Sequence, residues 1–306
     1  MARPLPFDAG DDAQLLCVGT SLDVLHARLV DASTERESLS RRDARAVPAG
    51  RTAVIRTGIS RELPVPGEWF TLNVEKTWRF GHTPYAKGEV TRCWRDLDAA
   101  SLPDLRVEEH GTWTLERWLQ DLGLTTDDLE PVYDVLRDGR VRREVELQGV
   151  LPDLFSPMAW EDDPILETIA WREMGEGFES EKRLCELTRQ DLRCLDAHAH
   201  LGNQAFPMGE VSPRWWERAR RHYLVGVDLA ERVLREDDVT PKGLLDNRPY
   251  LRCLHGLGLA TWALGDAQEG GRVFERLLRR DPSDGAGARF LLQAVRDGLT
   301  FEAFPD

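Results

Sequence analysis

The chain has 306 residues, of which 41% are hydrophobic, so it can bury a sizeable core in one to three domains. Its formal net charge is −14, and the charge is unevenly distributed: residues 1–115 carry 15 basic and 17 acidic side chains, against 25 and 37 in the rest. A strongly acidic C-terminal part disfavours general binding to nucleic acid or to anionic membranes. These totals still leave room for a local basic patch in the first part.

The five cysteines are odd in number, scattered along the chain, and form no C-x-x-C pair. This pattern argues against a disulfide framework and against a zinc-ribbon site. The first residues lack the apolar run of a signal peptide, and no stretch approaches the ~18 apolar residues of a membrane span. We therefore expect a cytoplasmic protein with no membrane segment, no metal and no cofactor.

Short runs rich in β-branched and aromatic residues lie between glycines and prolines in the first part of the chain. They cover residues 52–55, 69–78 and 85–94. The last two flank 80–84, whose glycine and proline suit a hairpin connection. Residues 1–110 are therefore predicted to form a small β-barrel or a half-open sheet.

Residues 111–158 are predicted to be a mixed connector rather than a domain. The stretch Thr112-Trp-Thr-Leu-Glu116 offers an N-cap and a glutamate near the first turn, so a helix is expected through about Leu122. A second helix is expected over 125–136, followed by a short strand within 141–147.

A 34-residue unit over 251–284 has the residue spacing of two antiparallel helices. Gly258 would let the two helices approach closely, with Phe274 filling the space between them. Gly265 would end the first helix, and Asp266 would cap the second. The unit resembles a tetratricopeptide repeat (TPR), a helix–turn–helix motif of the same length.

Two further units precede this repeat. Residues 195–235 carry the same Leu-Gly pair at 201–202, with five residues inserted at the turn, within 207–213. Residues 161–194 form a degenerate first unit, and a cap helix is expected over 285–300.

The predicted fold class is therefore α+β, with the β module at 1–110, the connector at 111–158, and a TPR-like helical domain of about three repeats plus a cap at 159–306. The chain also resembles a group of bacterial cytoplasmic repeat proteins with an N-terminal strand-rich part, and this resemblance supports the architecture only. The residues that carry it are Trp78-Arg-Phe-Gly-His-Thr-Pro-Tyr85, Asn247-Arg-Pro and Leu195-Asp-Ala-His-Ala-His-Leu-Gly202.

The string Asp196-Ala-His198-Ala-His200 has the pattern that opens metal-dependent amidohydrolases, where two histidines leave the end of a barrel strand. In the repeat register it falls in a helix, where residues two apart point about 200° apart and cannot chelate one ion. Only 106 residues follow, too few for the rest of an eight-stranded α/β barrel. No catalytic constellation is predicted, and a metal-dependent hydrolase remains an alternative.

In this repeat type, positions two, five, nine and twelve of each first helix face a concave groove. Arginine grips carboxylates bidentately, and Arg and Trp often dominate binding energy at interfaces, so the groove is predicted to hold a peptide with an acidic group. An alternative is that these arginines only balance acidic neighbours. The predicted partner-binding residues are Arg172, Asn203, Phe206, Arg252, His255, Trp262 and Arg289.

The predicted function is a non-catalytic protein–protein interaction adaptor or scaffold, which could also form a homo-oligomer. One alternative is a nucleic-acid-associated regulator, because arginines and aromatic residues follow one another over 36–85, as in single-stranded nucleic-acid platforms. Another is an enzyme whose site lies between the two parts. The residues behind the nucleic-acid alternative are Arg36, Arg41, Arg42, Arg45, Arg51, Arg56, Arg61, Trp69, Phe70, Trp78, Phe80 and Tyr85.

Overall fold

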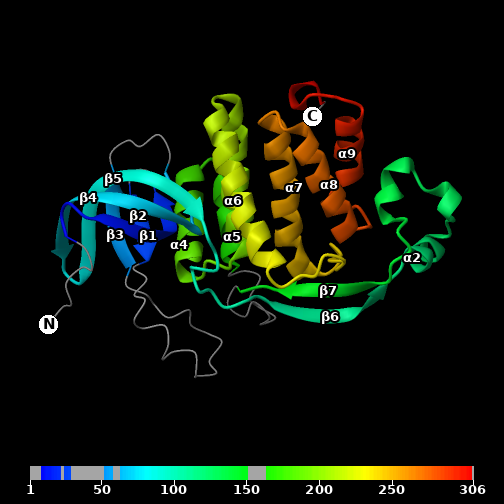
Figure 1. Cartoon of the computed structure of the whole chain (residues 1–306), viewed down its shortest axis with the longest axis horizontal. Helices are drawn as coiled ribbons and strands as arrows, with labels where there is room; N and C mark the ends of the chain where they lie inside the picture. The colour runs from blue at the N-terminus through cyan, green and yellow to red at the C-terminus, as the bar shows by residue number, and fades with distance from the viewer. Residues whose placement is uncertain (1–7, 22–23, 29–51, 58–62, 151–162, 305–306) are drawn as a thin grey trace. The chain divides into compact units, whose positions relative to one another are not determined.

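The computed structural model describes residues 8–21, 24–28, 52–57, 63–150 and 163–304. It has a mixed α+β fold, with a five-stranded sheet in the N-terminal part and helices in the C-terminal part (Figure 1). The chain divides into two compact units. Unit 1 comprises Met1–Pro103 and Pro152–Ala197, and unit 2 comprises Asp104–Leu151 and His198–Asp306.

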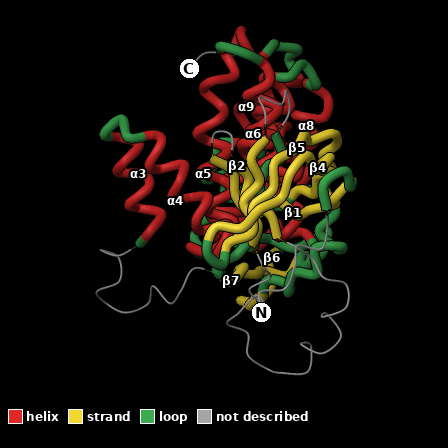
Figure 2. The backbone as a smooth tube through the Cα atoms, turned by 90° about the vertical axis from the view of Figure 1, so that its left-hand side faces the viewer, coloured by secondary structure: helices red, strands yellow, loops and turns green. Residues whose placement is uncertain are grey.

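Five strands form the sheet of unit 1: β1 (Asp12–Ser21), β2 (Val24–Arg28), β3 (Thr52–Thr57), β4 (Glu68–Phe80) and β5 (Thr83–Arg95). Their order is β1-β2-β3-β5-β4, and β4 pairs again with β1, so the pairings close into a ring (Figure 2). All pairs are antiparallel except β3 with β5. Three of the strands match runs expected from the sequence, whereas β1 and β2 were not expected individually.

The core of the sheet follows the two-residue alternation of β side chains. On β4, Phe70, Leu72 and Val74 are buried, whereas Asn73 and Glu75 between and after them are exposed. This alternation places one face of each strand inside the ring. The apolar residues that the sequence concentrates in these strands therefore form one core cluster.

Two helices, α3 (Pro164–Glu173) and α4 (Gly177–Gln190), belong to unit 1. The Thr188 hydroxyl on α4 donates to the Val18 carbonyl at 2.9 Å, and the Cys185 thiol donates to the Thr20 carbonyl at 2.9 Å. Both acceptors lie on β1 around a bulge, where the pairing register with β2 shifts. Helix α4 is thus hydrogen-bonded to the sheet of its own unit.

Unit 2 begins with a two-stranded antiparallel sheet of β6 (Arg106–Trp113) and β7 (Arg142–Gln148). Between them lie α2 (Leu115–Leu122), η1 (Thr126–Asp128) and η2 (Pro131–Leu136). The Thr114 side chain caps α2, and Gly123 ends it in the left-handed conformation. The cap thus lies within the expected stretch 112–116, and the helix ends at Leu122, as expected from the sequence.

The single helix expected over 125–136 is wrong. Residues 126–128 and 131–136 form two separate 3₁₀ helices. Pro131 has no N–H to continue a helix, and Glu130 before it is extended, with ψ of 146°. Both pieces of the segment are helical, but the proline divides them.

The remaining helices of unit 2 follow in sequence (Figure 1). They are α5 (Leu195–Ala205), whose first residues belong to unit 1, η4 (Phe206–Glu210), α6 (Pro213–Glu231), η5 (Leu245–Asn247), α7 (Arg248–Ala263), α8 (Ala267–Arg280), α9 (Ala288–Arg296) and η6 (Phe301–Ala303). Helix α7 packs against α6 and α8, and α8 packs against α9. None of the helices among the described residues combines the length and apolarity needed to cross a bilayer.

The contact between α7 and α8 has the features expected from the sequence. A Cβ on Gly258 would lie 2.3 Å from the Phe274 ring, so only glycine allows this approach. Gly265 has a φ of +93° after the end of α7, a conformation that glycine adopts without strain. The Asp266 side chain accepts a hydrogen bond from the Glu269 backbone N–H at 3.0 Å, which caps α8.

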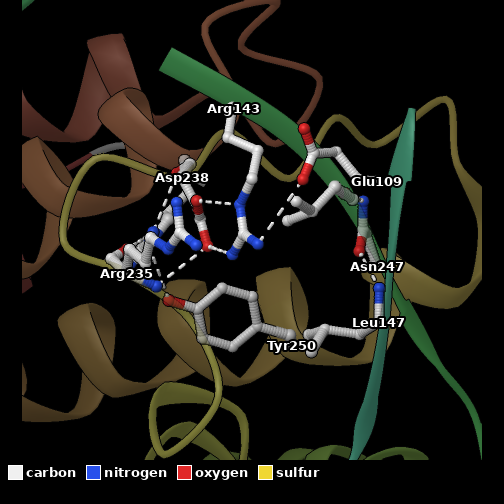
Figure 3. Close-up of polar contacts among 9 residues, drawn as sticks. Glu109, Arg143, Leu147, Arg235, Asp238, Asn247 and Tyr250 are labelled. Atoms are coloured by element: carbon white, nitrogen blue, oxygen red, sulfur yellow. Dashed lines mark hydrogen bonds and ion pairs between the residues drawn. The ribbon is translucent and has the colours of Figure 1, made fainter. Parts of the chain in front are cut away.

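The loop between α6 and α7 is fixed to strand β7 by a buried ion pair. Arg143 donates to both carboxylate oxygens of Asp238, at 2.9 and 2.6 Å, and also lies 3.7 Å from Glu109 (Figure 3). The Asp238 side chain is only 1% exposed. Burial alone would raise the pKa of Asp238, but hydrogen bonds from Arg143 and the Arg235 backbone hold it below its usual value.

Asn247 makes the second connection to β7. Its side chain accepts from the Leu147 N–H at 2.9 Å and donates to the Val145 carbonyl at 2.9 Å. In the sequence, Asp246 and Asn247 directly precede the helix of the third unit, and a side-chain cap for that helix is expected from one of them. Instead Asn247 bonds to β7, and the Asp246 side chain accepts from the Gly149 N–H at 3.1 Å.

Arg280, at the end of α8, joins the same network from the other side. It donates to the carbonyls of Arg235 and Asp238, at 2.7 and 2.8 Å, and to the Tyr250 hydroxyl at 3.1 Å. The Tyr250 hydroxyl in turn donates to Glu231 at 3.0 Å. One buried network therefore links the end of α6, the loop, α7 and α8.

We predict that Asp238→Ala lowers the free energy of unfolding by about 3 kcal/mol, because it leaves the guanidinium of Arg143 without its buried counter-ion. Urea unfolding followed by circular dichroism measures the change. The matched control is Asp237→Ala, which removes an adjacent carboxylate whose pair with Arg140 is exposed. Exposed pairs contribute little, so the control should change stability much less. Equal losses in the two variants would contradict a structural role for the ion pair.

Candidate functional site

An aromatic cluster in unit 2 brings together two of the predicted groove residues. The Phe301 ring lies 5.8 Å from the ring of Phe206, 5.7 Å from Trp216 and 5.7 Å from Trp262, measured between centroids. The interplanar angles are 84°, 76° and 81°. These are edge-to-face arrangements, in which the positive ring edge meets a negative ring face. We call Phe206, Trp216 and Trp262 the aromatic site.

Each ring of the aromatic site comes from a different element. Phe206 begins η4 directly after α5, Trp216 lies in α6, and Trp262 lies in the last turn of α7. Gly209 makes room for one of them, because a Cβ there would lie 1.9 Å from the Trp216 ring. The insertion that the sequence predicted as a loop over 207–213 thus contains the 3₁₀ helix that shapes the site.

Trp262 is the most deeply buried member of the aromatic site. Its side chain is only 2% exposed and packs against Phe274 from α8 and Phe304 from the chain after α9, at 6.4 and 5.5 Å between centroids. Its indole Nε1 is buried and has no acceptor among the described residues. A buried donor without an acceptor is unfavourable and uncommon in folded proteins.

Two other predicted groove residues are engaged within unit 2. Asn203 on α5 accepts a hydrogen bond from the Tyr223 hydroxyl at 2.8 Å. His255 on α7 is partly buried, and burial together with the charge of Lys242 lowers its pKa. Arg252, one turn earlier on α7, is exposed.

Arg289 does not present a free guanidinium. It donates to the Tyr133 hydroxyl at 3.1 Å, lies 3.7 Å from Asp284, and stacks over the Phe290 ring at 4.5 Å. Burial raises the pKa of Tyr133, while the hydrogen bond from Arg289 opposes that shift. The sequence-based alternative, in which an arginine balances its own neighbours, therefore describes Arg289.

Arg172 belongs to the other unit. It is exposed on α3 in unit 1. The aromatic site thus gathers Phe206 and Trp262 from the predicted set, whereas Arg172 lies in a separate unit.

Sequence reasoning missed Trp216, Phe301 and Phe304. Trp216 lies four residues into α6, outside the positions that the repeat register assigns to the groove. The signal for the other two was present, because a pair of phenylalanines follows Gly298 at a spacing of three residues. The register alone did not indicate where that segment would pack.

Two cavities in unit 2 lie outside the aromatic site. One has a volume of about 470 Å³ and is lined by four arginines and three glutamates, so the charges of the cavity wall largely balance. Arg276 in this wall is paired with Glu231 at 3.1 Å. The other, of about 370 Å³, lies beside β6 and α2. Its lining includes His110, Trp113, Arg117, Trp118, Asp121, Glu144, Asp281 and Ser283.

The Asp196–His200 string lies on α5, as the repeat register predicted. His198 is fully buried, whereas His200 two residues later is partly exposed, so the two side chains leave different faces of the helix. Among the described residues, no group of three or more His, Cys, Asp or Glu side chains is arranged to hold a metal ion.

The basic and aromatic residues of 36–85 divide between core and surface. Arg36, Arg41, Arg42, Arg45, Arg51 and Arg61 lie outside the described residues, and Arg56 on β3 is exposed. Phe70 is buried in the sheet, and the Trp69 indole donates to the Asp96 carbonyl at 2.8 Å. Trp78 and Tyr85 stack on each other at 5.5 Å, beside the exposed Phe80.

Comparison of the chain with protein-family models, with curated proteins and with solved structures finds no match.

We predict that His222, buried on α6, makes stability depend on pH. Burial lowers its pKa well below 6.5, and the charges of Arg218, His198 and Arg221 act in the same direction. Below about pH 6.5 the unfolded chain therefore binds a proton that the folded chain does not, and the free energy of unfolding falls by up to about 1.4 kcal/mol per pH unit.

Between about pH 7 and about pH 5, the free energy of unfolding of His222→Asn should fall less steeply with decreasing pH than that of the wild type. The difference in slope is the contribution of one proton. Urea unfolding at several pH values measures the slope. His82→Asn, at the exposed turn between β4 and β5, is the control and should keep the wild-type slope. An unchanged slope in the His222 variant would refute this assignment.

Proposed function

We propose that the chain is a non-catalytic protein–protein interaction adaptor that binds a peptide segment of a partner between TPR-type helix pairs. The observation that carries this proposal is the convergence of Phe206 and Trp262. Both occupy the twelfth position of a first helix in the expected register, and both contact the same ring, Phe301, which comes from outside the helix pairs. The site thus holds a short segment by its aromatic side chain.

The helix bounds support a TPR-type array. Helices α7 and α8 are 16 and 14 residues long and are separated by the three residues that the repeat places at its turn. Helices α3 and α4 are also separated by a short turn, with Gly175 in the left-handed conformation. Short connections of this kind favour antiparallel neighbouring helices, which is the unit of the array.

The charges support a partner with an acidic group. Arg172 and Arg252 are the exposed arginines of the predicted set, whereas Arg289 is partly buried and bonded to Tyr133 and Asp284. An exposed guanidinium can bind a carboxylate bidentately. We therefore assign the electrostatic part of recognition to Arg252 in unit 2 and, independently, to Arg172 in unit 1. The proposed setting is the cytoplasm, with a protein or peptide as partner.

Affinity capture from nuclease-treated lysate of the native cell tests this function. We expect a protein partner to be recovered with the wild-type chain and to fall at least about fivefold with Arg172→Glu/Arg252→Glu, because the substitution replaces attraction with repulsion. The control, Arg117→Glu/Arg279→Glu, makes the same change in charge at two exposed arginines of α2 and α8.

Thermal unfolding of each variant verifies that the fold is kept. Equal recovery with all three chains would overturn the groove assignment. A parallel capture omits the nuclease, and if material is recovered only from that untreated lysate, the nucleic-acid alternative replaces the adaptor.

A further inference from the structure

The segment that follows α9 lies on the aromatic site in the manner of a docked peptide. Gly298 ends α9 with a φ of +77°, and the short 3₁₀ helix η6 (Phe301–Ala303) comes two residues later. Phe301 and Phe304 are partly buried against the aromatic site, whereas Glu302 and Ala303 between them are exposed. Two rings spaced three residues apart therefore account for the contact.

The backbone of this segment is not tied to the helices that it covers. Within the described residues, the backbone hydrogen bonds of 300–304 run from the Ala303 N–H to the Thr300 carbonyl and from the Phe304 N–H to the Phe301 carbonyl. Both remain inside the segment. Residues 297–300, which lead to it, are all exposed. Release of the segment would thus break ring contacts but no backbone hydrogen bond to the rest of unit 2.

The segment fills the apolar part of the aromatic site but supplies no acceptor for the indole N–H of Trp262. Phe301 and Phe304 pack against Trp262, which is almost completely buried, yet the Trp262 Nε1–H has no acceptor among the described residues. A ligand that supplied the same two rings and also a carbonyl or carboxylate oxygen for this N–H would satisfy the site more fully.

We propose that residues 300–304 are a displaceable internal occupant of the aromatic site. We further propose that the partner is a protein segment with two phenylalanines three residues apart and an acceptor for the Trp262 indole. This inference rests on the proposed function and names both the chemistry of the partner and the regulation of the same site. The internal segment keeps the site closed until a better-fitting segment replaces it.

The expected competition is strong because the internal segment is tethered. A short tether holds the internal segment beside the site at a local concentration roughly in the millimolar range. An external peptide must therefore displace this segment before the peptide can bind. The apparent affinity of the wild-type chain is reduced by the fraction of molecules in which the site is open. Removing the two internal rings should therefore raise the affinity for an external peptide.

Fluorescence anisotropy with a labelled synthetic peptide of sequence 298–304 tests the proposal on the full-length chain. We expect Phe301→Ala/Phe304→Ala to bind this peptide at least about tenfold more tightly than the wild type does. A peptide in which both phenylalanines are alanine should not bind. The matched control is Phe80→Ala/Phe178→Ala, which removes two exposed phenylalanines of unit 1 and should behave as the wild type.

A second design keeps the test valid if the double variant does not fold. A protease site inserted after the exposed Gly298 allows the segment to be cut from the folded chain and removed by gel filtration. The cut chain is expected to gain peptide binding relative to the uncut chain. Equal affinity before and after the cut would overturn the proposal, as would equal affinity in the wild type and the double variant.

The outcomes separate this inference from the function on which it rests. If no chain binds the peptide but the captured partner is still lost with Arg172→Glu/Arg252→Glu, the adaptor function stands and only the internal-occupant proposal fails. If the double variant binds the peptide but no partner is captured by any chain, the adaptor function fails. The aromatic site is then a binding site for the chain's own segment, which an external peptide of the same sequence can replace.

Discussion

The buried ion pair between Arg143 and Asp238 is the interaction on which the arrangement of unit 2 depends. Strand β7 supplies the guanidinium, and the loop between α6 and α7 supplies the carboxylate. Beside them, the Val145 N–H donates to the Val239 carbonyl, and the Val239 N–H donates to the Arg143 carbonyl, so the loop runs as a short parallel partner of β7. The Asp238 carboxylate is buried and would be costly without its partner, so the pair with the partly buried Arg143 specifies one position of the loop.

This fixed loop sets the position of the aromatic site. Helix α7 begins directly after Asn247, whose side chain is hydrogen-bonded to the backbone of β7. A helix is a rigid rod that rises about 1.5 Å per residue, so Trp262 lies about 21 Å along the axis from the first residue of α7 and moves together with it. Arg280 joins the end of α8 to the same loop, which fixes the helix whose Phe274 packs behind Trp262.

Much of the fold was predictable because its signals are local. Gly265 and Asp266 mark the turn between α7 and α8 through their own backbone and side-chain preferences, and Gly123 does the same at the end of α2. The expected cap at Asn247 was wrong because its side chain bonds to Val145, 102 residues earlier, and no local pattern reports such a partner. Pro131, by contrast, does carry a local signal for a helix boundary, because proline cannot continue a helix from the preceding turn.

The site was predictable only in part, for the same reason. The repeat register places Phe206 and Trp262 on one side of the helices, because a register indicates which residues lie on the same helix face. It could not place Arg289, whose guanidinium bonds to a tyrosine 156 residues earlier. Nor could it reveal that a segment of the chain itself would cover Trp262.

The covering segment restricts what can bind more than the arginines do. Trp262 is 2% exposed, and the Phe301 and Phe304 rings are among those packed against it, so a partner that merely removed them would return apolar surface to water. Such opening is unfavourable by itself, whereas an exchange of one pair of rings for another leaves the buried apolar area nearly unchanged. The free energy that drives the exchange must then come from polar groups, through an acceptor for the Trp262 indole and through contacts with exposed arginines. Aromatic rings would decide whether a segment can enter the site, and charge would decide which of the aromatic segments displaces the internal one.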